Sequence, residues 1–446
     1  MKKVYIKTFG CSLNQSDSEL IAGLLEESGY ITESEYGPTI PKKDNYDLIV
    51  INTCSVKNHA ENKFFKELEY WKNKNKKIVV AGCIPQAEPT MLSQELTDVS
   101  VIGTRQLTKI VEVANHTLMG DVIHDISKEN TQRLNLPKKR KSNIIEIIPI
   151  CEGCLSNCSY CKTKQARGNL LSYTKEDIIS QFKEALSSGC KEFWLTSQDN
   201  GCYGFDIYRP QKYFLPQLLN DLCKIEGDFR IRVGMANPDH IKIIADDLIE
   251  SFKNPKIFKF LHIPIQSGNN RILKLMHRFY TKEDFIEIIR KFRQEIPEIV
   301  ISTDLIVGFP EETEEEFMES LELIKEIKPQ VLNLSRFWLR KGTAAEKLEQ
   351  VHGKISKVRS EIVRAEFDNY VKEVNKLWVG TIGPAIIDEY GKNNALIARN
   401  NFYKQIIISQ SDANNKKLKL GDIVLVEIIE SRTYDLVGKI ISDTYN

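Results

Sequence analysis

The chain has 446 residues, which is too many for one ordinary hydrophobic core, and this length suggests about three domains. With 41% hydrophobic and 28% charged residues the composition is that of a globular protein, and no apolar run reaches the roughly 18 residues of a membrane-spanning helix. The net charge of +1 argues neither for nor against a nucleic-acid partner, so an RNA-binding surface would need local clusters of basic residues.

The first residues, MKKVYIKTFGC, begin like a signal peptide but lack the apolar stretch that should follow. The polar run Asn14, Gln15, Ser16 and Asp17 comes instead, so we expect a mature N-terminus and a cytoplasmic location. Ten cysteines in such a chain are more typical of metal binding or catalysis than of a disulfide framework.

The N-terminal region is predicted to be a parallel α/β domain. Strands in KVYIKTFGC, DLIVINTCSV and KIVVAGCIPQ alternate with the helical patterns DSELIAGLLEESG and HAENKFFKELEYWKN, and VSVIG predicts a fourth strand. Cys11, Cys54 and Cys83 each follow one of the first three strands at once. Because the carboxyl ends of parallel strands meet at one edge of a sheet, these thiols can converge. One such cysteine is usually a small buried apolar residue, but three in the same topological position indicate a site.

Two further units are predicted after a polar, basic segment that reads as a linker or an exposed loop. Six strands, in IIEIIPI, EFWLTSQ, FRIRVGMA, FKFLHIPIQ, IVISTDLIVGF and QVLNLSRFW, favour a partial (β/α)6 barrel over a complete eight-unit one. Five short strands with Gly, Asn and Asp turns then predict a small antiparallel β-barrel. We therefore divide the α/β chain into an N-terminal domain at 1–124, a linker at 125–143, the partial barrel and its following helix at 144–375, and the terminal barrel at 376–446.

The segment CEGCLSNCSYC, residues 151–161, directly follows the first strand of the partial barrel. Cys154, Cys158 and Cys161 have the spacing C-x3-C-x2-C, with which three thiolates can bind three irons of a 4Fe-4S cluster. The fourth iron would stay open for S-adenosylmethionine (SAM), and Tyr160 is placed to pack beside its adenine. With Cys151 included, the same cysteines could instead hold a structural zinc ion. The β/α-barrel pattern that follows this segment favours the 4Fe-4S cluster over the zinc ion.

This cysteine spacing at the mouth of a β/α barrel resembles the radical-SAM superfamily, and the chain almost from end to end resembles its methylthiotransferase family. The runs GCLSNCSYCKTKQARG and LLSY are similar to the archaeal and eukaryotic branch, which modifies N6-threonylcarbamoyladenosine beside the tRNA anticodon. The resemblance implies a transferase that replaces the adenine C2–H with SCH3, using SAM and two 4Fe-4S clusters. One SAM would methylate a sulfur at the auxiliary cluster, and a second would be cleaved to a 5′-deoxyadenosyl radical.

The resemblance also assigns roles to particular residues. The motifs FGCSLNQSDSE and NTCSVKNHAE imply that Cys11, Cys54 and Cys83 hold the auxiliary cluster, with Asn14 beside it. Cys190, Cys202 and Cys223 show no comparable arrangement. Polar groups at the carboxyl ends of barrel strands are the candidates for binding SAM, although each could instead cap a helix or satisfy a loop. These candidates are Gln198, Arg232, Gln266 and Asp304.

The terminal barrel resembles a TRAM domain, an RNA-binding module. In ARNNFYKQ, Arg399, Phe402, Tyr403 and Lys404 combine stacking surface with positive charge, as unpaired bases and their phosphates require. The implied partners are the tRNA anticodon stem-loop, a reductase or ferredoxin-type electron donor and a sulfur donor, with no membrane.

Two alternatives to this function stay open. One is a methylthiotransferase acting on a ribosomal-protein aspartate, against which KTKQARG argues, and the other is a non-catalytic RNA-binding protein with structural zinc.

Overall fold

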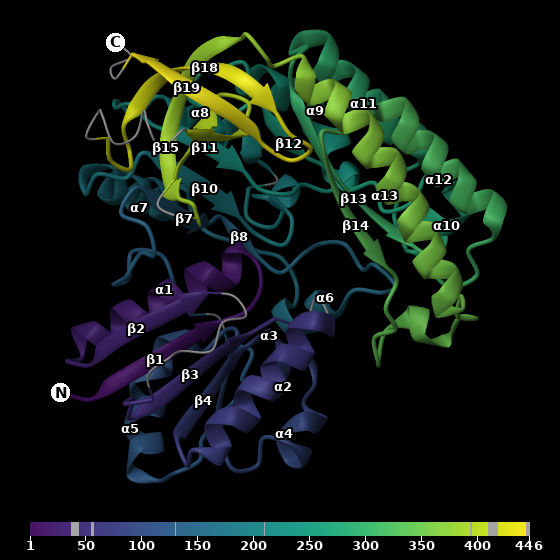
Figure 1. The fold of residues 1–446 in the computed structure, drawn as a ribbon. Coiled ribbons are helices and arrows are strands. Elements are labelled where there is room, and N and C mark those ends of the chain that lie inside the picture. Colours follow the sequence, from purple (N-terminus) through teal and green to yellow (C-terminus); the bar gives the residue numbers. More distant parts are fainter. Residues whose placement is uncertain are drawn as a thin grey trace.

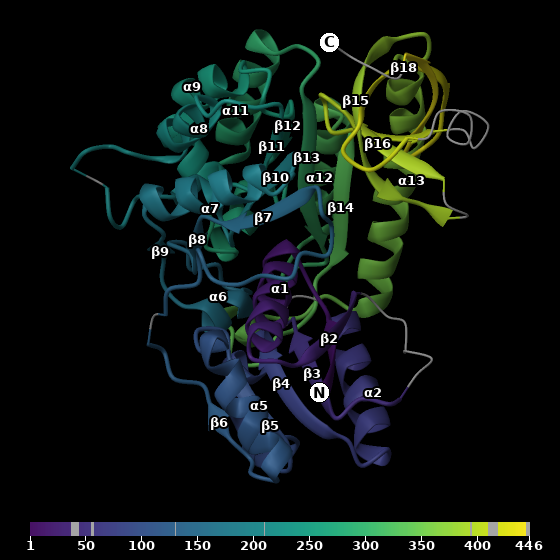
Figure 2. The same ribbon diagram turned by 90° about the vertical axis from the view of Figure 1, so that its left-hand side faces the viewer.

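The computed structural model describes residues 1–36, 44–54, 58–129, 131–208, 210–392, 395–408 and 418–442. It forms three units, with the N-terminal one below the other two in Figures 1 and 2. Among the helices within these ranges, none has both the length and the apolar character needed to cross a bilayer.

The N-terminal unit is a parallel sheet of six strands in the order β2-β1-β3-β4-β5-β6. Its strands are β1 (Lys3–Thr8), β2 (Ile31–Tyr36), β3 (Leu48–Thr53), β4 (Lys77–Gly82), β5 (Ser100–Gly103) and β6 (His124–Asp125). Its helices are α1 (Ser12–Glu27), α2 (Asn58–Asn73), α3 (Cys83–Ala87), α4 (Thr90–Gln94), η1 (Leu107–Lys109) and α5 (Ile110–Met119). The four predicted strands are confirmed. The edge strands β2 and β6 were not predicted, because one is largely polar and the other has only two residues.

Apolar cores cover both faces of this sheet, which explains why its central strands are mostly apolar. One core packs α1 and α5 onto the sheet, and the other packs α2 through Phe64, Leu68 and Trp71.

The second unit is the predicted partial barrel, and its six parallel strands are confirmed. They are β7 (Ile145–Pro149), β10 (Glu192–Thr196), β11 (Arg230–Val233), β12 (Phe260–His262), β13 (Val300–Val307) and β14 (Val331–Arg336). They pair as β7-β10-β11 and β12-β13-β14, and the bonds Ile231 N–Lys256 O (2.7 Å) and Ala236 N–His262 O (3.0 Å) join the two halves.

Helices cover the outside of this barrel, and short elements lie at its carboxyl end. The covering helices are α7 (Lys175–Ser187), α8 (Leu215–Cys223), α9 (Pro238–Phe252), α11 (Lys282–Glu295) and α12 (Glu314–Ile327). The short elements are β8 (Cys151–Glu152), α6 (Lys162–Arg167), β9 (Leu171–Ser172), η2 (Asn200–Cys202), α10 (Asn270–Leu275) and η3 (Ala344–Lys347). The long helix α13 (Gly353–Lys376) then leads to the third unit (Figure 1).

The third unit is a closed barrel of five strands in the order β15-β16-β17-β19-β18. Its strands are β15 (Ile382–Tyr390), β16 (Leu396–Asn400), β17 (Gln405–Ile408), β18 (Ile423–Ser431) and β19 (Leu436–Ser442). The predicted five-stranded antiparallel barrel is confirmed, with four of its five pairings antiparallel and one parallel. Strands β17 and β19 run parallel, because a closed ring with an odd number of strands cannot alternate direction at every pairing.

A buried network of four charged side chains joins the N-terminal unit to the partial barrel. Arg133 Nη1 lies 2.8 Å from Asp17 Oδ1 and 3.0 Å from Glu152 Oε1. Arg167 Nη2 lies 2.6 Å from Asp17 Oδ2, and all four side chains are at most 4% exposed. Burial by itself would raise the pKa of Glu152, but the charges of Arg133 and Arg167 outweigh it and hold that pKa below its ordinary value. Glu152 is therefore ionised.

Part of the segment predicted as a linker, residues 131–140, packs into this junction. Besides Arg133, it supplies Lys138, whose Nζ lies 2.6 Å from Glu146 Oε1 and 3.6 Å from Glu19 Oε2. A Cβ atom at Gly23 of α1 would lie 2.2 Å from the carbonyl oxygen of Pro137, so the segment lies directly on that helix. Arg133, Lys138 and Arg140 of this segment form ion pairs with buried carboxylates.

The five-stranded barrel packs against the amino ends of the strands of the partial barrel. The Tyr403 ring lies 4.9 Å from that of Phe258 and 5.2 Å from that of Phe260, measured between centroids. Lys259 N donates to Asn401 O at 2.8 Å.

Two carboxyl groups with raised pKa values lie at this junction. Burial and the charge of Asp388 raise the pKa of Glu192 to about 7. Burial, opposed by Arg399, raises that of Asp388 to about 6.

Replacing Arg133 with Met should destabilise the protein by about 3 kcal/mol, because Asp17 and Glu152 would lose a buried counter-charge. Urea unfolding followed by circular dichroism measures this loss. A suitable control is Lys291→Met, which removes a pair with Asp246 whose side chains are 38% and 82% exposed. It should cost less than about 0.5 kcal/mol. Equal unfolding midpoints for the two variants would contradict a stabilising network.

The stability of the C-terminal junction should fall as the pH rises. The folded pKa values of Glu192 and Asp388 exceed the ordinary value, so both groups bind protons more tightly when folded. Their stabilising effect is complete below about pH 4 and is lost as the pH rises through the folded values of about 6 and about 7. Glu192→Gln, which imitates the protonated group, should flatten this dependence between pH 5 and about 8. Thermal unfolding across that range tests it, and an unchanged slope would refute the assignment to Glu192.

Candidate active site

The cysteine loop between β8 and α6 is held in place by backbone hydrogen bonds at several points. Cys154 N donates to Gly168 O at 3.3 Å, and Ser159 N donates to Met276 O at 3.0 Å. Gly153 has a φ of +67° and lies so close to Asn169 that a Cβ atom would be 2.0 Å from its carbonyl oxygen. Only glycine fits there, which explains the glycine directly before Cys154.

Cys154, Cys158 and Cys161 lie together in this loop and are all partly exposed. Burial, followed by the charges of Cys158 and Cys154, raises the pKa of Cys161 to about 11. A buried guanidinium group completes the set, since Arg278 Nη1 lies 3.2 Å from Cys158 Sγ. A cation beside Cys158 stabilises its thiolate, and three thiols in one loop are a donor set that fits an iron–sulfur cluster.

Cys202 lies beside this loop, although its sequence position gave no such indication. A hydrogen bond with Cys202 and burial raise the pKa of Cys154. Cys202 Sγ also lies 3.1 Å from the carbonyl oxygen of Asp199, which Cys151 Sγ approaches to 3.6 Å. The one available signal was its place just after the strand end of β10, three residues from Asp199.

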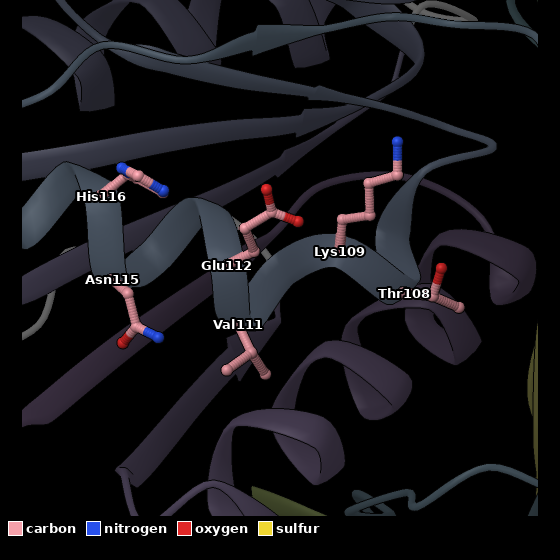
Figure 3. A pocket seen from close by; sticks show the side chains of 6 residues that line it. All are labelled: Thr108, Lys109, Val111, Glu112, Asn115 and His116. Carbon is pink, nitrogen blue, oxygen red and sulfur yellow. The ribbon is translucent and has the colours of Figure 1, made fainter.

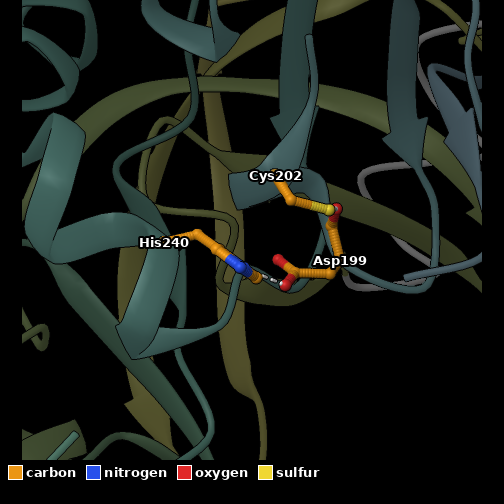
Figure 4. A group of neighbouring side chains, drawn as sticks. All are labelled: Asp199, Cys202 and His240. Atoms are coloured by element: carbon orange, nitrogen blue, oxygen red, sulfur yellow. Dashed lines mark hydrogen bonds and ion pairs between the residues drawn. The ribbon is translucent and has the colours of Figure 1, made fainter. Parts of the chain in front are cut away.

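Asp199, Cys202 and His240 offer ligand atoms that all lie within 4.8 Å of one another (Figure 4). Hydrogen bonds within the protein already occupy these atoms. Asp199 Oδ2 lies 2.6 Å from His240 Nδ1, while Oδ1 accepts from the backbone N–H groups of Gly201 and Asn237, both at 2.9 Å. We therefore interpret the group as a support for the barrel mouth.

Two of the residues predicted to bind SAM lie at the carboxyl end of the barrel. One has a side-chain atom without a hydrogen-bond partner, and the other has a strained backbone. Gln198 directly follows the strand end of β10, and its buried Oε1 has no hydrogen-bond partner in the described structure. Gln266 has a φ of +68°, and on β13 its N–H donates to Asp304 O at 2.8 Å while its carbonyl oxygen accepts from Ile306 N at 3.0 Å. Strained backbone of this kind is common at binding sites.

Asp304 and Tyr160 are also in the region of the cysteine loop, whereas Arg232 is not. Asp304 Oδ2 lies 3.0 Å from His262 Nε2, and the Tyr160 ring packs edge-on against Phe309 at 6.1 Å. The Arg232 guanidinium lies over three aromatic rings at the amino end of the barrel, belonging to Trp194, Phe260 and Tyr403. The described contacts therefore do not support a SAM contact by Arg232.

Cys11, Cys54 and Cys83 are brought together at the carboxyl edge of the N-terminal sheet. Asn14 Oδ1 lies 3.5 Å from Cys11 Sγ and 4.0 Å from Cys83 Sγ. A Cβ atom on Gly10, whose φ is +122°, would lie 2.7 Å from Cys54 Cβ and 3.1 Å from Cys54 Sγ. Asn14 and Gly10 thus form the floor between the three thiols. Three converging thiols are a donor set that an iron–sulfur cluster fits, and their role as ligands remains a prediction.

The short helix α6 lies between the two groups of thiols. Cys161 caps its N-terminus, while Ala166 near its other end packs on Cys83. A helix of six residues is about 9 Å long, so the two thiol groups are near neighbours. In both ribbon views α6 lies at the boundary of the N-terminal unit (Figures 1 and 2).

The four residues predicted to bind RNA lie at or near the junction of the terminal barrel. Lys404 is buried and its Nζ donates to Asn375 Oδ1 at 2.7 Å, while Phe402 packs edge-on against Trp378. Arg399 lies 3.0 Å from Asp388 and stacks on Tyr403. These contacts give the residues a packing role, and their RNA-binding role remains a prediction.

A hollow along α5 is lined by none of the predicted site residues (Figure 3). Two of its members form pairs, Lys109 with Asp125 and His116 with Asp121. We assign it no role.

Comparisons with known proteins agree with this architecture. Residues 148–324 match the radical SAM superfamily, and residues 3–103 match a family described as uncharacterized protein family UPF0004. A radical S-adenosylmethionine methyltransferase from Kitasatospora setae, solved with cobalamin and a 4Fe-4S cluster, superposes with a TM-score of 0.54. It covers 77% of each chain at 14% identity, which supports the fold alone.

Relatives of much higher identity extend along the whole chain. A probable threonylcarbamoyladenosine tRNA methylthiotransferase of Pyrococcus horikoshii is 38% identical over 99% of this chain and 100% of its own. The human threonylcarbamoyladenosine tRNA methylthiotransferase is 37% identical over 99% of this chain and 75% of its own. These matches confirm the resemblance inferred from the sequence motifs, and the chain belongs to the threonylcarbamoyladenosine tRNA methylthiotransferase family of the radical-SAM superfamily.

Proposed function

We propose that this protein transfers a methylthio group to C2 of the adenine in N6-threonylcarbamoyladenosine, next to the anticodon of tRNA. The observation that carries this proposal is the pair of three-thiol sites on either side of α6, one from each of two domains. A radical-SAM enzyme needs only the site in the barrel. A second set of thiols next to it supplies a place for the sulfur that such a transfer requires.

The proposed roles follow from the two sites. Cys154, Cys158 and Cys161 would hold a 4Fe-4S cluster with one open iron, which supplies one-electron reductive cleavage of SAM when both are bound. Gln198 offers SAM a buried acceptor atom without a partner, Gln266 is hydrogen-bonded to Asp304 within β13, and Tyr160 offers a ring. Cys11, Cys54 and Cys83 would hold the auxiliary cluster.

An exposed loop after β14 gives the RNA a surface next to these sites. Lys162 Nζ and Gln165 Nε2, both on α6, donate to the carbonyl oxygens of Lys341 and Gly342 at 2.7 and 2.8 Å. The same loop carries Trp338, whose exposed fraction is 57%. An exposed aromatic ring beside basic residues suits unpaired bases such as those of an anticodon loop.

The same proposal includes partners and a location that follow from the chemistry. Reductive cleavage of SAM consumes an electron, which a reductase or ferredoxin-type donor would supply, and each turnover consumes a sulfur atom from a sulfur donor. A cytoplasmic location would bring the enzyme together with its tRNA.

The activity can be tested with anaerobically reconstituted protein and tRNA that carries threonylcarbamoyladenosine. Mass spectrometry of the digested nucleosides should show the methylthio product only when SAM and a reductant are both present. Matched reactions with a ribosomal protein in place of tRNA test the rival substrate. Methylthiolation of an aspartate there, with no change in the tRNA, would overturn the proposed substrate.

Mutations should distinguish the functions of the two thiol sites. The unmutated protein should bind about eight irons per chain, and Cys54→Ala and Cys154→Ala should each bind about four. Cys54→Ala should still cleave SAM but lose methylthiolation, whereas Cys154→Ala should lose SAM cleavage. Cys190→Ala, which changes a buried thiol outside both sites, should keep both activities. Zinc in place of iron, or identical behaviour of Cys54→Ala and Cys154→Ala, would contradict two separate clusters.

A further inference from the structure

The side chain of Arg167 reaches from the partial barrel toward the N-terminal thiols. Arg167 is the last residue of α6, and its side chain is 1% exposed. Its Nη2 donates to Asp17 Oδ2 at 2.6 Å and to Asn14 Oδ1 at 3.4 Å. Asn14 is the residue whose oxygen also lies near the sulfur atoms of Cys11 and Cys83. The guanidinium therefore lies at the edge of the proposed auxiliary site.

Part of this guanidinium has no acceptor within the protein. Nε and Nη1 are buried and form no hydrogen bond in the described structure. Glu152 Oε2 lies 3.7 Å from Nη1, which is close enough for an ion pair but too far for a hydrogen bond. Buried donors without acceptors cost free energy and are rare in folded proteins. Their presence indicates that an acceptor is missing.

The neighbouring groups identify what that acceptor would be. Ala166, the residue before Arg167, packs on Cys83, so this end of α6 adjoins the thiol. Asn14 Oδ1, which accepts from Arg167 Nη2 at 3.4 Å, also lies 4.0 Å from Cys83 Sγ. The sulfur of Cys83, or a sulfide held with it, is therefore an acceptor within reach of the free N–H groups.

The charge balance of the junction favours the same conclusion. Asp17, Glu152, Arg133 and Arg167 carry two negative and two positive charges, so the network is neutral as a whole. An anionic cluster bound to three thiolates next to Arg167 adds negative charge, which this guanidinium would partly offset.

We propose that Arg167 is a positioning residue for the auxiliary cluster, and that it donates hydrogen bonds to a sulfur atom of the cluster held by Cys11, Cys54 and Cys83. The inference rests on the second cluster of the proposed function. Because Arg167 belongs to the barrel, the auxiliary cluster is complete only when the two domains are docked. Hydrogen bonds and positive charge at a cluster sulfur raise the reduction potential, so Arg167 also sets the potential of the auxiliary cluster.

The test uses full-length protein carrying Cys154→Ala, Cys158→Ala and Cys161→Ala, which leaves only the auxiliary cluster. In this background, Arg167→Met should lower the midpoint potential, measured by a redox titration followed by electron paramagnetic resonance. It should also speed the loss of iron to a chelator. Arg167→Lys keeps the charge and should give a smaller shift. Circular dichroism of each variant checks that the fold is retained.

Asp17→Asn serves as the matched control for a merely structural effect. It breaks the same ion pair but leaves Arg167 in place and frees its charge, so the potential should rise or stay unchanged. If Asp17→Asn and Arg167→Met lowered the potential alike, or if Arg167→Met left it unchanged, the inference would be wrong while the second cluster stood. If the background protein bound no iron at all, the proposed second cluster would be wrong, and this inference with it.

Discussion

The arrangement of both thiol sites depends on the buried ion network at the junction of the first two domains. Desolvating four charged side chains is costly, and only their mutual contacts compensate for it. Asp17 comes from the N-terminal unit, Arg133 from the connecting segment, and Glu152 and Arg167 from the barrel. Asp17 and Arg133 have their partners in this network only when the two units are docked, whereas Glu152 and Arg167 also pair with each other at 3.7 Å. The network therefore fixes one relative placement, and with it the separation of the two groups of thiols.

The two ends of the partial barrel perform different tasks. At the carboxyl ends lie the cysteine loop, Gln198 and Gln266, as expected for β/α barrels, whose sites form at that end. At the amino ends, the first residues of three strands, Glu192, Arg230 and Phe260, interact with the five-stranded barrel. Catalytic chemistry and the attachment of the third domain are thereby separated by the length of the strands.

Much of the fold was predictable because it depends on local patterns and simple topological rules. Apolar runs located the central strands, and the rule that parallel strands end at one edge led from Cys11, Cys54 and Cys83 to one place. Cys202, His240 and Arg167 could not be found in this way, because their roles arise from contacts between segments far apart in sequence. The packing of Tyr403 and Lys404 was missed for a related reason. An aromatic ring beside a lysine has the same composition whether it faces RNA or another domain.

The short helix α6 connects a recognisable sequence motif at one end with an arginine that no motif marks at the other. Its N-terminus is the last cysteine of a motif whose spacing is recognisable, whereas its other end carries an arginine that spacing does not mark. Once the helix is formed, the cysteine at one end fixes where the arginine at the other must lie, since six helical residues permit little variation in length. The motif that forms the barrel site thus also places the guanidinium of Arg167 beside the thiols of the N-terminal unit. The run KTKQARG therefore connects the two thiol sites, and its length matches the distance between them.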